Sequence, residues 1–255
     1  MKLSLFTAVL TLLVCGWNTQ ALAERWVGIY VKQDLDQAID SRTSWREFER
    51  NLEQRWDEGY RIEAIEYGDG KWVGVFNQQG SEQAFNTRGT WDEFRAVVRD
   101  RWDEGYALMS VAYGEGMWVG FFTRQRELQA LEWNSNLDRF DESIIRRTNN
   151  GYELNAVKYG EGKWVGVFTK SRSRRDQGVQ YYNSYREFRE DLNEAWGESY
   201  RVADIAYGQR EWVVHYAPNR QQQRVSTSDD WSAFEREFKA QWDRGYVMTR
   251  LVWSP

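Results

Sequence analysis

Residues 60–76 read Tyr-Arg-Ile-Glu-Ala-Ile-Glu-Tyr-Gly-Asp-Gly-Lys-Trp-Val-Gly-Val-Phe, and similar stretches recur along the chain. Apolar and polar residues alternate in the first half, with a change of parity between Ile62 and Ile65, which predicts a strand containing a β-bulge. The Gly-Asp-Gly at residues 68–70 predicts a hairpin turn. Residues 72–76 are apolar on both faces, so we expect this second strand to be buried on both sides.

A third strand and a helix complete the predicted unit. The strand covers residues 83–86 and has the weaker pattern. Thr90 and Glu93 then stand at the spacing of a capping box, which predicts the start of a helix, and Gly105 predicts its end. The apolar face of this helix is formed by Trp91, Phe94, Val98 and Trp102.

The unit is repeated five times along the chain. The tyrosines that begin the units are separated by 46, 46, 48 and 46 residues, and a tryptophan of the second strand and a phenylalanine of the helix keep the same spacing. A period of this length indicates a repeat architecture. The five initial tyrosines are Tyr60, Tyr106, Tyr152, Tyr200 and Tyr246.

The two ends of the chain share one unit. Residues 246–255 supply its first strand and residues 24–59 supply the remainder. An open array would carry atypical capping units, whereas pairing of the two terminal strands would remove the free sheet edges. We therefore predict an α+β fold: a closed five-fold toroid of β-β-β-α repeats of about 46 residues, sealed by pairing of the N- and C-terminal strands.

The first 23 residues have the features of a secretory signal peptide. Lys2 precedes an apolar stretch at residues 3–15, and small residues stand at Ala21 and Ala23, before the expected cleavage site. The apolar stretch is shorter than a membrane-spanning helix requires, and no later stretch approaches that length. We expect export by the Sec route, with the mature domain in the periplasm or outside the cell.

The mature domain would comprise residues 24–255. Acylation of Cys15, as in a lipoprotein, is the alternative, although Val14 is bulkier than the residue expected before a lipidated cysteine. Because Cys15 is the only cysteine of the chain, the mature domain would contain no disulfide and no cysteine nucleophile.

Composition narrows the functional classes. The chain has 39 acidic and 34 basic residues, mixed along its length, so it lacks the basic stripe of a nucleic-acid-binding protein. Its single histidine, His215, stands where the sister strands have apolar residues, and both a core or channel position and a functional role are open to it. One histidine is too few for the usual zinc sites, and the Gly-Asp-Gly turns lack the clustered oxygen ligands of a calcium loop. We expect no metal and no cofactor.

A glutamine follows the strand tryptophan of every unit, and it is the recurrent feature that core packing does not explain. One interpretation is structural, with the side-chain amide satisfying a turn or edge at each junction between units. The other is functional, with five amides around a mouth or channel that bind a polar ligand. The five candidates are Gln37, Gln83, Gln129, Gln177 and Gln223.

Trp133 is the one tryptophan of the mature chain that falls outside the repeat pattern. Strand and helix positions of the core account for the others. Trp133 is therefore the best single candidate for an exposed aromatic contact with a ligand.

Residues 55–62 and 101–106, each followed by a Tyr-Gly turn and a Trp-containing strand, resemble the uncharacterised Trp/Gly/Tyr repeats found C-terminal to the kinase domain of plant casein-kinase-like proteins. The pattern departs from these repeats at Thr148 and Ser199. The resemblance implies a non-catalytic accessory domain. Unit number and element order also resemble the five-fold α/β propeller of the penteins, which is a likeness of architecture alone.

These features together predict an exported, non-catalytic binding or scaffold module that recognises a protein or a cell-envelope glycan. The alternative is a glycan hydrolase that uses two carboxylates, because paired acids such as Asp57 and Glu58 are plentiful. The oligomeric state is left open by the sequence.

Overall fold

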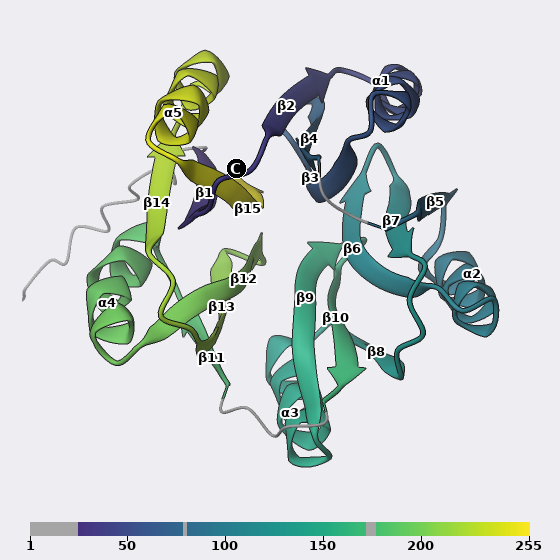
Figure 1. Ribbon diagram of the computed structural model, residues 1–255. Coiled ribbons are helices and arrows are strands. Elements are labelled where there is room, and N and C mark those ends of the chain that lie inside the picture. The colour runs from purple at the N-terminus through teal and green to yellow at the C-terminus, as the bar shows by residue number, and fades with distance from the viewer. Residues whose placement is uncertain (1–24, 79–80, 172–176) are drawn as a thin grey trace, which may run out of the picture.

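The computed structural model describes residues 25–78, 81–171 and 177–255. Within them the chain forms five helices and fifteen strands, which make five units arranged around a common centre in a propeller-like manner (Figure 1). The predicted α+β class and the repeated units are confirmed. The predicted signal peptide, residues 1–23, lies outside the described residues.

Each unit is a three-stranded antiparallel sheet with one helix. The inner strands, nearest the common centre in Figure 1, are β3 (Arg61–Gly68), β6 (Ala107–Gly114), β9 (Tyr152–Gly160), β12 (Tyr200–Gly208) and β15 (Tyr246–Ser254). The middle strands are β4 (Lys71–Asn77), β7 (Met117–Thr123), β10 (Lys163–Lys170), β13 (Glu211–Pro218) and β1 (Arg25–Lys32). The outer strands are β2 (Gln37–Arg42), β5 (Gln83–Arg88), β8 (Gln129–Asn134), β11 (Gly178–Tyr182) and β14 (Gln223–Ser228). The helices are α1 (Trp45–Asp57), α2 (Trp91–Asp103), α3 (Leu137–Asn149), α4 (Tyr185–Gly197) and α5 (Trp231–Asp243).

The predicted hairpin with its bulge is present. The register between β3 and β4 shifts between Ile62 and Ala64, which leaves Glu63 outside the ladder. Asp69 and Gly70 both have positive φ angles, of 46° and 67°, as a tight hairpin turn of this hand requires. The middle strand β4 is buried along almost its whole length, as its apolar pattern predicts.

The helices begin and pack as predicted. The Thr90 side chain accepts a hydrogen bond from the backbone N–H of Glu93, whose carboxylate reaches back to the backbone of Thr90, which is a complete capping box. Phe94 and Val98 of this helix are fully buried against strands of the same sheet.

The sequence repeat that starts at Tyr60 spans two sheets. Strand β5 pairs with β7 rather than with β4, so each outer strand belongs to the sheet after the hairpin that precedes it in the chain. The hairpin turns also link neighbours. Glu115 of one turn accepts hydrogen bonds from the indole N–H of Trp72 at 2.8 Å and from the backbone N–H of Trp45 at 2.7 Å, and both tryptophans belong to the preceding unit.

The N- and C-terminal strands pair with each other. The β1–β15 ladder runs from Arg25 opposite Ser254 to Lys32 opposite Tyr246, which confirms the predicted pairing. The inner strands contact one another in chain order, β3 with β6, β6 with β9 and β9 with β12, and β15 contacts both β12 and β3.

Candidate functional site

The five repeat glutamines join neighbouring sheets. Gln83, at the start of β5, accepts a hydrogen bond from the backbone N–H of Ile62 and donates one to its carbonyl, both at 2.9 Å, although Ile62 belongs to the preceding sheet. At the fourth junction between sheets, the Gln177 amide accepts a hydrogen bond from the backbone N–H of Leu154 and donates one to the carbonyl of Tyr152. The other junctions pair Gln37 with Met248, Gln129 with Leu108, and Gln223 with Val202. These hydrogen bonds support the structural interpretation, because both polar atoms of each amide bind the backbone.

Trp133 lies on β8 and is 37% exposed. The guanidinium carbon of Arg95 lies 4.2 Å from the centre of its ring, and the ring also contacts Trp91 with 5.8 Å between centroids. With Arg99 and Arg147 it lines a cavity of about 280 Å³. The partial exposure agrees with the sequence expectation, but a protein cation already covers part of the ring.

Charged side chains from four inner strands meet at the common centre. Lys158 on β9 pairs with Glu66 on β3. Arg250 on β15 lies 3.1 Å from Asp204 on β12 and 3.5 Å from Glu63 on β3, measured between nitrogen and oxygen atoms. Burial raises the pKa of all three carboxyl groups, and the two cations oppose this effect.

His215 lies on β13, opposite Asp204 in the β12–β13 ladder, and is 3% exposed. Burial, and secondarily the nearby charge of Arg250, lower its pKa to about 4, so the ring is neutral at pH 7. Neither ring nitrogen has a hydrogen-bond partner among the described residues. These facts support the core or channel interpretation of His215.

The centre has little free space. The cavity among the charged groups measures about 30 Å³, which leaves room for only a few water molecules. A neighbouring cavity of about 200 Å³ is lined by His215, Asn155 and Arg250. The ion pairs of Glu63, Glu66 and Asp204 therefore join inner strands, and the cavity beside Glu63 and Asp204 has no room for a sugar ring.

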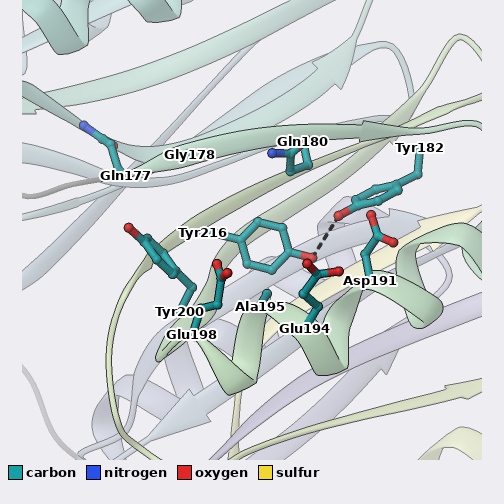
Figure 2. A pocket seen from close by; sticks show the side chains of 10 residues that line it. All are labelled: Gln177, Gly178, Gln180, Tyr182, Asp191, Glu194, Ala195, Glu198, Tyr200 and Tyr216. Atoms are coloured by element: carbon teal, nitrogen blue, oxygen red, sulfur yellow. Dashed lines mark hydrogen bonds between the residues drawn. The ribbon is translucent and has the colours of Figure 1, made fainter.

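A larger pocket lies between α4 and the sheet of the fourth unit (Figure 2). It measures about 410 Å³, which is within the usual range for ligand sites. The helix supplies one wall, and β11, β12 and β13 supply the rest. Its polar lining consists of Gln177, Gln180, Tyr182, Asp191, Glu194, Glu198, Tyr200 and Tyr216, with Gly178 and Ala195 between them.

Negative charge dominates this pocket. Asp191 and Glu194 on α4 and its C-cap residue Glu198 stand three and four residues apart, so they lie on one face of the helix and its end. The remaining lining residues are neutral. Such an arrangement attracts a cation and repels an anion.

The hydroxyls of Tyr182 and Tyr216 lie beside Glu194 and Asp191 (Figure 2). The Tyr182 and Tyr216 oxygens are 3.2 Å apart, and both residues are buried. Burial raises the pKa of both hydroxyls, so both stay protonated at neutral pH and each can donate a hydrogen bond.

The acid-lined pocket is a site that the sequence pattern alone did not single out. The signal that would have indicated it is a departure from the repeat. Ala195 stands where α1, α2 and α3 have arginine, and Gly178 stands where three outer strands have alanine. Both changes remove side-chain volume between the helix and the outer strand.

In the described parts of the chain, no three His, Cys, Asp or Glu side chains are placed to hold a metal ion. No helix of those parts is both long enough and apolar enough to cross a membrane.

The chain was compared with known proteins. No protein-family model matches it, and no curated protein sequence matches it. The function is therefore argued from the geometry of the site.

Proposed function

We propose that the protein is an exported, non-catalytic binding module, and that the pocket beneath α4 is its ligand site. The observation that carries the proposal is a pocket of about 410 Å³ in which Asp191, Glu194 and Glu198 are the charged lining groups. Carboxylates and hydroxyls at such a site recognise a cationic group. A protein partner with a basic side chain fits this chemistry better than a neutral envelope glycan.

The scaffold of this module is proposed to be a closed five-fold ring. The pairing of β1 with β15 and the contacts of β15 with both β12 and β3 support closure. A closed ring holds every sheet edge in contact with a neighbour, so it would present the pocket on a rigid frame. The resemblance to non-catalytic repeats of plant kinases favours the same accessory role.

Glycan hydrolysis is the alternative function. A glycosidase needs one carboxylic acid with a raised pKa beside a sugar-sized site. Glu63 and Asp204 have raised pKa values, but the cavity beside them measures only about 30 Å³. The acids of the larger pocket are exposed side chains of α4 and of its C-cap residue Glu198, and they lack an apolar enclosure. Both facts favour binding.

The test compares the unchanged protein with the triple variant Asp191→Asn, Glu194→Gln, Glu198→Gln on an array of cationic, neutral and anionic peptides and of envelope glycans. We expect cationic peptides to bind and the triple variant to lose that binding while its melting temperature is kept. The matched control neutralises three exposed acids of α1 and α2, namely Glu53, Asp57 and Asp103.

Two outcomes would overturn the proposal. One is glycan or cationic-peptide binding that the triple variant leaves unchanged. The other is release of new reducing ends from a glycan, lost on changing one carboxylate, which would establish the hydrolase.

A further inference from the structure

A groove with three arginines crosses the junction between two neighbouring sheets. Helix α2 packs on the sheet of β5, β6 and β7, and β8 belongs to the next sheet. The cavity of about 280 Å³ beside Trp133 is lined by residues from both, and we call it the α2–β8 groove. Arg95 and Arg99 line it from α2, and Arg147 lines it from α3. None of its lining residues is acidic, although the whole chain carries a net charge of −5.

The positive charge of the α2–β8 groove is only partly neutralised by the protein. Arg147 pairs with Glu132 at 2.6 Å. Arg95 pairs with Asp92, whose side chain is 83% exposed, so solvent weakens this pair. Arg99 has no ion pair within the described parts of the chain. Arg95 and Arg99 stand four residues apart on α2, where like charges repel each other, and a bound anion would relieve this repulsion.

The Arg95 guanidinium is held in place by an aromatic ring. Its central carbon lies 4.2 Å from the centre of the Trp133 ring, and Trp91 contacts the same ring. The Nε of Arg95 is buried and has no hydrogen-bond partner in the part of the chain that the structure describes. Buried N–H donors are almost always paired. A stacked guanidinium with an unpaired donor is therefore prepared to receive a planar acceptor.

The other four junctions between a helix and the next outer strand do not combine a guanidinium with an indole ring. At the junction of α3 with β11, the Tyr181 hydroxyl donates a hydrogen bond to Asp141, so the two sides bind each other directly. At the remaining three junctions the strand position holds a small hydroxyl residue. The residues equivalent to Arg95 are Glu49, Asp141, Arg189 and Glu235, and those equivalent to Trp133 are Thr87, Tyr181, Thr227 and Ser41. The combination of arginine and tryptophan is therefore specific to one junction and is not part of the repeat.

We propose that the α2–β8 groove binds the carboxylate side chain of a Glu or Asp residue of a partner protein. The inference goes beyond the proposed function, because this groove lies at another junction and has the opposite charge to the pocket beneath α4. The edge of a guanidinium offers parallel N–H donors that match the two oxygens of a carboxylate. Arg95 supplies a stacked guanidinium, and Arg99 supplies a second one within the same groove.

Two observations favour a peptide side chain over an acidic sugar. A sugar ring binds best on a free aromatic face, but Arg95 lies over the Trp133 ring, and Arg147 and Lys170 both lie over the Tyr152 ring. The cavity of about 280 Å³ is also slightly smaller than the usual range for small-molecule sites, whereas it accommodates an acidic side chain. An acidic peptide segment therefore fits the groove best.

The test measures binding by isothermal titration calorimetry with the purified full chain. The probes are the peptide Gly-Glu-Glu-Gly with blocked ends, its counterpart with glutamine in place of glutamate, D-glucuronate and inorganic phosphate. We expect the glutamate peptide to bind at least tenfold more tightly than each of the other probes. Raising the NaCl concentration should weaken its binding, because the contacts are between charges near the protein surface.

Two variants act on the groove by different routes. The double variant Arg95→Gln, Arg99→Gln removes two charges and should weaken binding of the glutamate peptide at least tenfold. Trp133→Thr introduces the residue of the sister strands at Thr87 and Thr227. It keeps both charges but removes the ring that positions Arg95, so it should weaken binding at least threefold. Two independent variants keep the test valid if one fails to fold.

The matched control is the double variant Arg46→Gln, Arg50→Gln. These arginines are exposed, stand four residues apart on α1 and do not line the α2–β8 groove. Asp176→Asn tests whether an acid of the chain itself occupies the groove, because Asp176 is the one acidic residue of the segment 172–176, which lies outside the described residues. Both variants should bind the glutamate peptide within twofold of the unchanged protein.

Equal binding of the glutamine peptide, or normal binding by either groove variant, would overturn the inference. So would glucuronate or phosphate that binds as tightly as the glutamate peptide, or an Asp176→Asn variant that binds this peptide at least tenfold more tightly than the unchanged protein. The triple variant Asp191→Asn, Glu194→Gln, Glu198→Gln should bind the glutamate peptide normally although it should lose cationic peptides. The two proposals are therefore tested separately.

Discussion

The side-chain amide of Gln129 holds both backbone polar atoms of Leu108: it accepts from the N–H at 2.7 Å and donates to the carbonyl at 3.0 Å. Leu108 lies on β6, the inner edge strand of a different sheet. Backbone groups on a buried sheet edge need partners outside the ladder. The amide supplies them, and it thereby fixes the position of one sheet relative to the next.

Replacing Gln129 by Ala should lower the free energy of unfolding by about 2–4 kcal/mol, because an N–H and a carbonyl are left unpaired in a buried place. Urea denaturation followed by tryptophan fluorescence measures the change. The control is Gln125→Ala, because the exposed Gln125 side chain donates a hydrogen bond to Glu127 of the same loop, and the substitution should change stability by less than about 0.5 kcal/mol. Equal effects of the two substitutions would contradict the structural role of the repeat glutamine.

Much of the fold could be predicted because each unit carries local signals. The Gly-Asp-Gly at residues 68–70, the capping pair Thr90 and Glu93, and the parity change after Ile62 each correspond to an observed turn, cap or bulge. The assignment of outer strands to sheets was not predictable in this way. Strand pairing across a junction depends on tertiary contacts, and the local pattern of β5 fits either neighbour.

Removing Lys158 should be strongly destabilising, because its partner Glu66 would remain buried with an uncompensated charge. We expect Lys158→Met to lower the free energy of unfolding by about 3–5 kcal/mol. The double variant Lys158→Met, Glu66→Gln should recover most of this loss. A double-mutant cycle in chemical denaturation measures the coupling. Lys71→Met breaks a more exposed pair with Asp69 and should cost less than about 1 kcal/mol. Additive effects of the first two substitutions would refute the pairing.

His215 should make the protein lose stability in mild acid. Its folded pKa is lowered to about 4, so the unfolded state, with a pKa of about 6.5, binds more protons between these values. The stability contributed by the neutral ring is present above about pH 6.5 and is lost by roughly 2–3 kcal/mol as the pH falls to 4.

His215→Val introduces the residue of the sister strands at Val75 and Val167 and should remove this part of the pH dependence. Melting temperatures of both proteins between pH 7.5 and 4 measure the difference. The contributions of the acidic groups that both proteins share cancel in this comparison. Parallel pH curves for the two proteins would show that the histidine is not buried in its neutral form.

Closure of the proposed ring predicts that the chain tolerates new ends. A circular permutant that joins Pro255 to residue 24 through a Gly-Asp-Gly linker and opens between Asp69 and Gly70 should fold with a melting temperature close to that of the natural order. Deletion of residues 246–255 should instead unfold the domain, because it removes Val247, Met248, Leu251 and Val252 from the core. A truncated protein with an unchanged melting temperature would show that β15 is not needed to close the ring.

The candidate site was harder to predict than the fold. Asp191, Glu194 and Glu198 look like solvated helix acids in the sequence, and they form a pocket only because Ala195 and Gly178 leave space between α4 and β11. The charged centre had no sequence signal either, since Glu66 and Lys158 stand 92 positions apart. A sequence repeat shows only the residues that all units share. The pocket depends on residues in which the fourth unit differs from the others, and the charged centre depends on contacts between units.

Two strands pair with β1, namely β14 and β15. Both begin at residue 223 or later. A growing polypeptide therefore presents β1 long before either partner exists, for on the order of ten to forty seconds at roughly 5–20 residues per second of synthesis. During that interval Trp26, Val27 and Ile29, which are fully buried in the finished protein, have nothing to pair with. Completion of this sheet therefore waits for the synthesis of residues 223–254, and until then the nascent chain needs either a holding chaperone or delayed collapse.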